Sequence, residues 1–320
     1  MKWGIIGYGQ FAPSFLASLE EIETEEVTAI ATRSGVDRAR KDYPSAIIYS
    51  DYALLYQDEE IEIVYVATTH DTHKDHVLKA LEYGKHVICE KPMSLTEADT
   101  IEMIHQARNR GLFLMEGLWI RYLPIYRKMM NEITQGTIGS PKTLTANFCF
   151  EQTSGNESRL LNRKLGGGAL YDLGIYQISY ATDIFKSAPT NIFSTTQMTE
   201  TGVDGIVNTM LEFEDGGVAH LFCSILMNSD RKLIVYGTKG RIEMNLDGKM
   251  ESYTVIKDGQ IREEKASFIS TGYFHEIEHA IASIKSHKIS PKWFSHEDSI
   301  LNAKIVDLIK NIWEKSALIN

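Results

Sequence analysis

Lysine, aspartate and tyrosine residues of this chain have the types and spacing to move a proton at a carbon-bound oxygen. Lys91 follows Glu90 at the end of the apolar stretch HVIC, and Asp172 and Tyr176 lie four positions apart in GGGALYDLGIYQ. On a helix, residues four apart share a face. A tyrosine, whose ordinary pKa is about 10, can serve as proton donor when a nearby ammonium group favours its phenolate. Both segments also have a structural interpretation, because charges and proline end strands and helix tyrosines pack in cores.

A second group of residues, near the N-terminus, has the spacing of a dinucleotide-binding loop. In GIIGYGQFAPSF, Gly7, Gly9 and Ala12 fit the pattern G-x-G-x-x-G/A between a strand and a helix. Gly7 permits a tight turn, and Gly9 lets the backbone approach a pyrophosphate whose charge the helix N–H groups meet. The predicted cofactor contacts here are Gly7, Gly9, Gln10, Phe11 and Ala12.

The next strand ends in AIATRSGVDRAR, where an NAD-binding site would normally offer an acidic residue to the ribose hydroxyls. Here Thr32, Arg33 and Ser34 follow the strand, and Arg38 follows in the next helix. A guanidinium group can pair with a 2'-phosphate, which a carboxylate would repel. The sequence therefore predicts NADP(H) in preference to NAD(H). The alternative is that these arginines only begin a solvated helix.

Two later strand ends complete the predicted cofactor site. Its remaining contacts are Thr68, Thr69, His70 and His73 in YVATTHDTHKDHV, together with Glu90 and Lys91. His70, His73 and His76 do not converge on one point at this spacing, so we predict no metal. The three cysteines are far apart in the sequence and predict neither a disulfide framework nor a zinc site.

The predicted substrate pocket is lined by Trp119, Arg121 and Tyr122 in addition to Tyr176. An aromatic wall with a guanidinium group suits a polyhydroxylated or carbonyl substrate. For Arg121, a structural role at a domain junction is an equally good interpretation.

The elements that must position these residues change along the chain. From residue 1 to about 120, apolar runs alternate with amphipathic segments at 11–22, 35–43, 73–84 and 96–110, which is typical of a parallel sheet with helical crossovers. After about residue 190, short strand-like segments with Asp/Gly turns predict one antiparallel sheet. A helix from 168 to 184 is expected to cover this sheet, and further helices are expected at 273–287 and 296–316.

The predicted fold class is therefore α/β plus α+β. Residues 1–120 would form a Rossmann domain with a doubly wound parallel sheet, and residues 121–320 a substrate and oligomerisation domain with an open antiparallel sheet covered by helices. The last helix, 296–316, could pack back on the first domain. One sheet face would remain uncovered, which predicts a homodimer through this sheet.

Composition narrows the possible partners. The chain has 320 residues, 43% of them hydrophobic, and a net charge of -10, which argues against a nucleic-acid partner. The N-terminus MKWGIIGYG lacks the apolar stretch of a signal peptide, and no apolar run could span a bilayer. We expect no membrane association and a cytoplasmic location.

The segments EKPMSLT and GGGALYDLGIYQ resemble the glucose-fructose oxidoreductase, inositol dehydrogenase and MocA family. The tyrosine form of the second segment, with MEGLWIRYLP, is most similar to the family's dimeric dihydrodiol dehydrogenase-like branch. The resemblance covers nearly the whole chain. It implies that Lys91 is the catalytic lysine, Tyr176 the proton donor and Asp172 its acidic helper, and that the Lys91–Pro92 bond is cis.

The sequence thus predicts an NADP-dependent oxidoreductase. It would transfer a hydride between nicotinamide and a secondary alcohol or carbonyl of a sugar-like, diol or dicarbonyl substrate, without a metal. The alternatives are a non-catalytic sensor that binds NAD(P) and a sugar, and an NAD-dependent sugar dehydrogenase.

Overall fold

The computed structural model describes residues 1–155, 157–248 and 250–317, and the chain divides into two compact units. The first unit contains Met1–Leu123 and Phe268–Ile300, and the second contains Pro124–Ser267 and the chain from Leu301 onward. The domain boundary at residue 120 stays a prediction.

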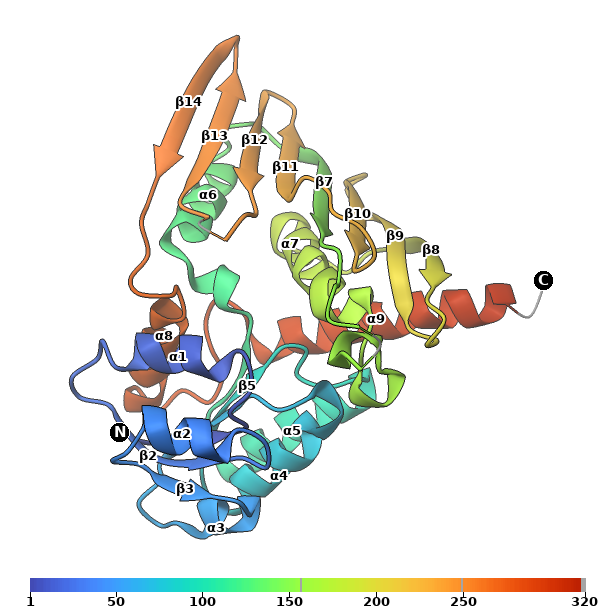
Figure 1. The fold of residues 1–320 in the computed structure, drawn as a ribbon. Helices are drawn as coiled ribbons and strands as arrows, with labels where there is room; N and C mark the ends of the chain where they lie inside the picture. The colour runs from blue at the N-terminus through green and yellow to red at the C-terminus, as the bar shows by residue number, and fades with distance from the viewer. Residues whose placement is uncertain (156, 249, 318–320) are drawn as a thin grey trace. The chain divides into compact units, whose positions relative to one another are not determined.

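The first unit is built on a six-stranded parallel sheet with the order β3-β2-β1-β4-β5-β6 (Figure 1). Its strands are β1 (Lys2–Ile6), β2 (Glu26–Ala31), β3 (Ile47–Tyr49), β4 (Ile63–Val66), β5 (His86–Glu90) and β6 (Leu114–Gly117). This strand order is that of a doubly wound sheet, in which ligands bind beyond the carboxyl ends of the strands near β1 and β4. The predicted Rossmann fold is confirmed.

Helices cover both faces of this sheet, so its central strands are largely buried; all four residues of β4 are apolar or aromatic and buried. The helices are α1 (Ala12–Leu19), α2 (Val36–Asp42), α3 (Tyr52–Gln57), α4 (His73–Glu82), α5 (Glu97–Arg110) and α8 (Phe274–Lys285), with the 3-10 turns η1 (His70–Thr72) and η2 (Trp119–Tyr122). The Thr96 side chain caps α5, and Gly111 ends it in the left-handed conformation.

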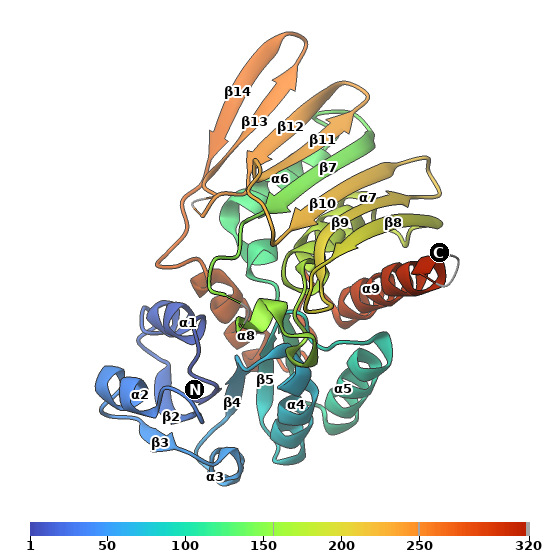
Figure 2. The same cartoon turned by 45° about the vertical axis from the view of Figure 1, so that its right-hand side comes forward.

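The second unit contains an eight-stranded sheet with the order β14-β13-β12-β11-β7-β10-β9-β8 (Figure 2). Its strands are β7 (Pro141–Cys149), β8 (Asn191–Met198), β9 (Asp204–Glu212), β10 (Val218–Ser224), β11 (Lys232–Gly237), β12 (Gly240–Asn245), β13 (Ser252–Lys257) and β14 (Gln260–Lys265). The predicted antiparallel pairing holds except between β7 and β10, which pair in parallel. The predicted open antiparallel sheet is therefore confirmed for the strands after residue 190, and the one parallel pair arises because β7, a strand that was not predicted, lies between β10 and β11.

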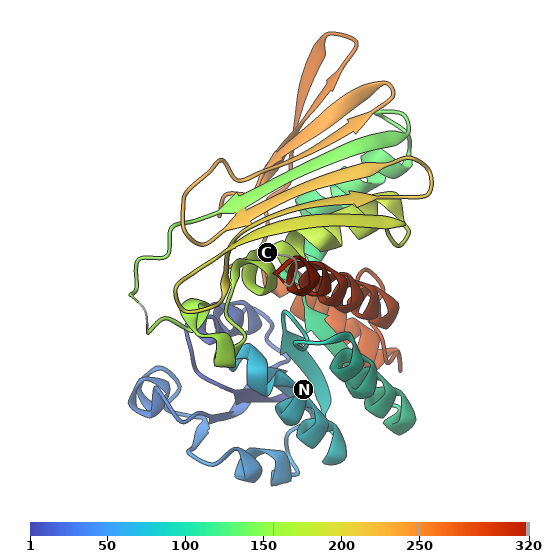
Figure 3. The same cartoon turned by 90° about the vertical axis from the view of Figure 1, so that its right-hand side faces the viewer.

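One face of this sheet carries α6 (Pro124–Thr134) and α7 (Ile175–Phe185). Ala219, Leu221 and Cys223 of β10 are buried toward these helices, so Phe222 alternates to the opposite face. Figure 3 shows that opposite face turned to the viewer, with no helix of the described residues in front of it. The remaining helical elements of this unit are the 3-10 turns η3 (Arg159–Leu161) and η4 (Arg163–Leu165), the π-helix η5 (Leu170–Gly174) and most of α9 (His296–Ala317).

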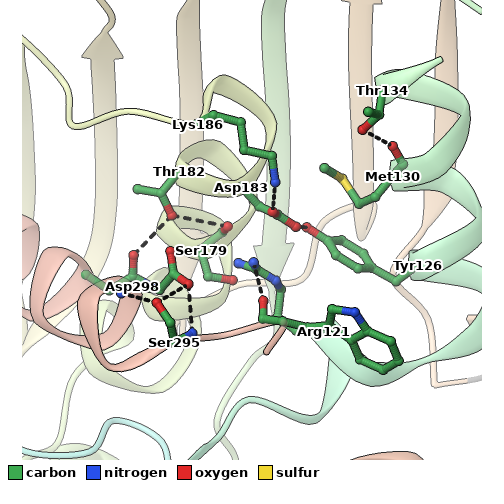
Figure 4. A network of polar contacts seen from close by, with 12 residues as sticks. Arg121, Tyr126, Met130, Thr134, Ser179, Thr182, Asp183, Lys186, Ser295 and Asp298 are labelled. Carbon is green, nitrogen blue, oxygen red and sulfur yellow. Dashed lines mark hydrogen bonds and ion pairs between the residues drawn. The ribbon is translucent and has the colours of Figure 1, made fainter. Parts of the chain in front are cut away.

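A buried carboxylate joins the two covering helices. Asp183 of α7 accepts the Tyr126 hydroxyl of α6 at 2.9 Å and also pairs with Lys186, which follows α7 (Figure 4). A buried carboxylate is stabilised when donors reach both of its oxygens, as they do here. This contact fixes α7, the helix that carries Tyr176.

Candidate active site

The glycine loop after β1 leaves an open space above its backbone. Gly7 has φ +90°, and a Cβ there would lie 2.7 Å from the Ala67 carbonyl oxygen, so only glycine fits. A Cβ on Gly9 would meet only that same oxygen, at 3.9 Å. A cavity of about 470 Å³ lies beside the loop. It is lined by Tyr8, Gly9, Gln10, Ser34, Gly35 and Arg38. The loop therefore fits the pyrophosphate and ribose of a dinucleotide.

Two predicted cofactor residues hold this loop in place. Arg38 donates to the carbonyl oxygens of Tyr8 and Gly9, both at 2.6 Å, and its guanidinium lies 4.8 Å from the Tyr8 ring centre. Thr32 is buried, and its hydroxyl accepts the Tyr8 N–H at 3.3 Å and donates to the Ser34 carbonyl. Tyr8 and Gly35 line the cavity although we had not predicted them, because neither has a side chain that signals phosphate binding.

Arg33 has a different position at the same edge of the sheet. Its exposed guanidinium lies over the Tyr52 ring, 5.1 Å from the centre, and Tyr52 in turn contacts His76 edge-on at 4.6 Å. His76 also shares a 2.6 Å hydrogen bond with Tyr56, and its pKa is lowered to about 4, chiefly by burial. The cation available for a phosphate in this group is therefore Arg33.

A second buried carboxylate fixes the end of β5. Glu90 accepts the Tyr65 hydroxyl of β4 at 2.6 Å and the Lys91 N–H at 3.2 Å. Glu90 and Lys91 are each 7% exposed, and the following Lys91–Pro92 bond is cis, as the resemblance implied. The backbone that carries the Lys91 ammonium is thus held by a short hydrogen-bonded chain between two strands.

The residues after Lys91 have partners of their own. The two ring nitrogens of His73 lie 2.9 Å from the Pro92 carbonyl oxygen and 3.3 Å from that of Thr68. His73 is fully buried, which lowers its pKa. The Met93 N–H donates at 2.9 Å to Glu116 of β6, a carboxyl whose burial raises its pKa to about 7. His73, predicted to contact the cofactor, therefore links two backbone segments from the interior.

In the second unit, the predicted Asp172 and Tyr176 lie on a helical segment with an unexpected first turn. Leu170–Gly174 is a π-helix, with the Ile175 N–H bonded to the Leu170 carbonyl, and α7 begins only afterwards. The first turn is therefore wider than that of an α-helix, and the shared face of Asp172 and Tyr176 stays a prediction. Asp172 is buried and pairs at 2.8 Å with Arg159 of η3.

Tyr176 is half-buried beside an aromatic residue of the sheet. Its ring centre lies 6.1 Å from that of Phe148, and the Arg231 guanidinium lies 5.4 Å from the Phe148 ring centre. We had predicted neither Arg159 nor Phe148, since their positions in the sequence give no indication of contact with the helix.

Two of the three glycines before this segment are required because other atoms lie too close to their backbone for a side chain to fit. A Cβ on Gly167 would lie 2.5 Å from the Leu160 carbonyl oxygen, and a Cβ on Gly168, where φ is +120°, would overlap the Asp204 carboxylate. Asp204 accepts the Leu170 N–H at 2.6 Å. Burial raises the pKa of Asp204 to about 6, although its backbone hydrogen bonds oppose the rise. Asp204 is therefore the cap that fixes the start of the segment bearing Asp172 and Tyr176.

The three other predicted substrate residues lie on η2 in the first unit. Trp119 stacks on Tyr273 with ring centres 5.7 Å apart. Arg121 and Tyr122 are only 2% and 1% exposed, and Arg121 donates to the Trp293 carbonyl at 2.8 Å while lying over Phe294. This burial favours the structural interpretation of Arg121 and argues against substrate contact by Tyr122.

The strand order and glycine loop are those of a dinucleotide-binding fold, and comparison with known proteins gives the family. Residues 1–118 match the model described as an oxidoreductase family with an NAD-binding Rossmann fold, and residues 126–243 match the GFO/IDH/MocA C-terminal domain. The chain belongs to the GFO/IDH/MocA family and is an NAD(P)-dependent oxidoreductase. The resemblance stated from the sequence is confirmed.

Curated relatives include trans-1,2-dihydrobenzene-1,2-diol dehydrogenases. The protein from Mus musculus is 35% identical over 252 residues, covering 76% of this chain and 74% of the relative. The protein from Xenopus tropicalis is 31% identical over 323 residues and 96% of both chains.

Solved structures show the same fold. KijD10, a 3-ketoreductase from Actinomadura kijaniata in complex with NADP and TDP-benzene, is 25% identical, with a TM-score of 0.88 and 97% coverage of both chains. A levoglucosan dehydrogenase in complex with NADH and levoglucosan is 19% identical, with a TM-score of 0.89, and covers 98% of this chain and 97% of its own. No helix in the described part of the chain has the length and apolar character needed to cross a membrane.

The close approach of Asp204 predicts the effect of enlarging Gly168. Gly168→Ala should lower the free energy of unfolding by about 1–3 kcal/mol, because the new Cβ meets the carboxylate and the positive φ is strained. Urea denaturation measures the loss. The matched control is Gly248→Ala, whose Cβ would meet no atom within 4 Å. Equal stability of the two variants would show that Asp204 does not constrain this turn.

Proposed function

We propose that the protein is an NADP(H)-preferring oxidoreductase that acts on a secondary alcohol or carbonyl of a sugar-like, diol or dicarbonyl substrate. The observation that carries the proposal is the buried Tyr65–Glu90–Lys91 chain, which holds the backbone of Lys91 at the carboxyl end of the sheet, where a nicotinamide site belongs. The names of the diol dehydrogenase and 3-ketoreductase relatives support the substrate class.

We assign the cofactor contacts to the glycine loop and neighbouring strand ends. Gly7 and Gly9 would let backbone N–H groups reach the pyrophosphate, and Arg33 would pair with the 2'-phosphate. Arg38 and Thr32 hold the loop through the contacts described above. Further contacts are proposed at Gln10, Phe11, Ala12, Ser34, Thr68, Thr69, His70 and Glu90.

When bound, the cofactor supplies or accepts the hydride. In the reducing direction, the Tyr176 hydroxyl donates its proton to the substrate oxygen, and in the oxidising direction the phenolate accepts it. The Lys91 ammonium stabilises negative charge on that oxygen and on the phenolate. Asp172, through its ion pair with Arg159, orients the start of the Tyr176 segment, and Trp119 is proposed as the aromatic wall of the substrate pocket. No step requires a metal.

We place the enzyme in the cytoplasm, because Cys89, Cys149 and Cys223 are all free and buried. We also propose a homodimer formed through the face of the eight-stranded sheet that α6 and α7 do not cover. Phe222 of β10 and Ile234 of β11 are half-buried positions on that face.

Replacing the proton-transfer groups should abolish turnover but preserve cofactor binding. In Lys91→Ala and Tyr176→Phe, we expect turnover to fall by about 10²–10⁴-fold, the usual contribution of positioned acid–base groups. The assay follows reduced-cofactor absorbance with a panel of diols, aldoses and dicarbonyls, and fluorescence titration measures NADPH affinity. The control is Tyr236→Phe, an exposed tyrosine of β11.

Wild-type rates in both active-site variants would contradict these roles. If the wild-type protein bound NADPH tightly but turned over none of these substrates, the non-catalytic sensor would be the better assignment.

Arg33 should determine the preference between cofactors. Arg33→Ala removes the charge-assisted hydrogen bonds to the 2'-phosphate, and we expect the NADPH/NADH affinity ratio to fall about 10–100-fold. Arg40→Ala, at an exposed position of α2, is the control. An unchanged ratio in Arg33→Ala would favour the NAD-dependent alternative.

The proposed homodimer through the uncovered sheet face can be tested by the mass of the protein in solution. At micromolar concentration, sedimentation should give twice the chain mass of 36.2 kDa, and Phe222→Glu should shift the protein toward monomer because it places a charge in the interface. Phe222→Leu keeps an apolar side chain at the same position and is the control, which should leave the dimer intact. A monomeric wild-type protein would refute the dimer.

A further inference from the structure

Glu276 of α8 is a buried acid that the proposed mechanism does not use. Its side chain is 0% exposed, and neither carboxyl oxygen has a hydrogen-bond partner among the described residues. An ionised carboxylate without donors is very costly in a protein interior. Such a group therefore requires either a bound proton, a bound water molecule or both.

The surroundings of Glu276 are set by one face of α8. Tyr273, Glu276 and His279 are spaced three apart and so share that face, which packs on η2. Trp119 stacks on Tyr273 at 5.7 Å, and the Tyr122 ring lies 5.2 Å from that of His279. Glu276 thus lies between two ring contacts made by η2.

The Tyr122 hydroxyl is also buried and has no hydrogen-bond partner among the described residues. Two unpartnered polar groups on packed elements, each too far from the other for a direct hydrogen bond, are the usual lining of an internal water site. One water molecule there can accept a hydrogen bond from one group and donate a hydrogen bond to the other.

A second carboxylate faces the same cluster. The Phe15 ring stacks on Tyr65 at 3.6 Å and contacts Tyr273 edge-on at 5.9 Å, so Tyr65, the hydrogen-bond donor to Glu90, lies beside the start of α8. Two nearby buried carboxyls do not both ionise readily. Glu90 accepts hydrogen bonds from the Tyr65 hydroxyl and the Lys91 N–H, whereas Glu276 has no donor among the described residues. The negative charge therefore belongs on Glu90 and the proton on Glu276.

We propose that Glu276 is a neutral carboxylic acid in the folded protein and that it binds, together with Tyr122, an internal water molecule. As a positioning residue, it would leave Glu90 as the charged carboxylate that holds the Lys91 backbone; only this consequence rests on the proposed function. Burial, with a smaller contribution from Glu90, raises the pKa of Glu276 well above its ordinary value.

The ionisable groups around Glu276 come from several elements. They are Glu90 of β5, Tyr65 of β4, Tyr122 and Arg121 of η2, and Tyr273 and His279 of the α8 segment, with Glu116 and Asp298 acting on Tyr122. Among these, Glu116 is itself a buried acid with a pKa raised to about 7, so the test must separate it from Glu276.

Infrared spectroscopy of the carboxyl C=O stretch makes that separation. At a pH of about 8.5, Glu116 is ionised, as is Asp204 with its pKa of about 6. We expect a band from a protonated buried carboxyl in the wild type and in Glu278→Gln, an exposed acid on the same helix. Glu276→Gln should lack the band and Glu90→Gln should keep it. The reverse pattern, or no band in the wild type, would overturn the proposal.

Stability gives an independent measurement. A group whose folded pKa is raised above the unfolded value of 4.5 stabilises the fold at low pH, and this contribution is lost as the pH rises. Glu276→Gln should therefore lose less stability than the wild type between about pH 5 and pH 9, in thermal melts. If the melting temperatures of the wild type and Glu276→Gln fell equally as the pH rose, the pKa of Glu276 would not be raised.

The water site is tested by high-resolution crystal structures of the wild type and Tyr122→Phe, which removes a single hydroxyl and should still fold. We expect an ordered water within hydrogen-bond distance of Glu276 and the Tyr122 hydroxyl, and its loss in the variant. A dry site in the wild type would overturn this part. None of these measurements uses a substrate, so they remain decisive even if the proposed reaction is wrong.

Discussion

The hydrogen-bonded carboxylate of Glu90 is the constraint on which the first unit's chemistry depends. A charge in this position would be costly without partners, but it receives the Tyr65 hydroxyl from β4 and the Lys91 N–H from its own strand end. His73 and Glu116 then fix the two residues after Lys91 through backbone groups. The backbone of Lys91 therefore cannot shift without breaking several buried contacts. This is the preorganisation that the proposed role of Lys91 in proton transfer requires.

The second unit achieves the same result with different residues. Asp204 accepts a backbone N–H at the start of the π-turn, and the triple glycine lets the chain approach this carboxylate. Asp183 of α7 accepts a hydrogen bond from Tyr126 of α6 and so fixes the two helices to each other. The side chain of Tyr176, on α7, lies beside the Phe148 ring. In each unit a buried carboxylate with satisfied donors thus fixes the backbone near a proposed proton-transfer group.

Local patterns were sufficient to predict much of this arrangement from the sequence. The helix predicted at 96–110 is observed at Glu97–Arg110, and the glycine loop and the strand before Lys91 were found from apolar runs and spacing. The strand β3 and the helix α3 were missed because three and six residues are too few to show a period. The strand β7 was also missed, and with it the one parallel pair in the second sheet.

Contacts between distant positions could not be predicted. Arg159 and Asp204 lie far from Tyr176 in ordinary loop and strand sequences, and Glu276 in YFHEIEHA has the appearance of a solvated helix residue. The sequence gives the residue types of a site, but the partner of a buried charge depends on how the elements pack. The same reason explains why Arg121, which resembles a substrate ligand in the sequence, is found bonded to the Trp293 carbonyl.

The most direct measurement is a crystal structure of the protein with NADP and a small polyol or dicarbonyl ligand. The proposed reaction requires the Lys91 Nζ and the Tyr176 hydroxyl to lie within about 3 Å of the same ligand oxygen. A structure in which the two groups contact separate cavities, with no ligand atom in reach of both, would contradict it.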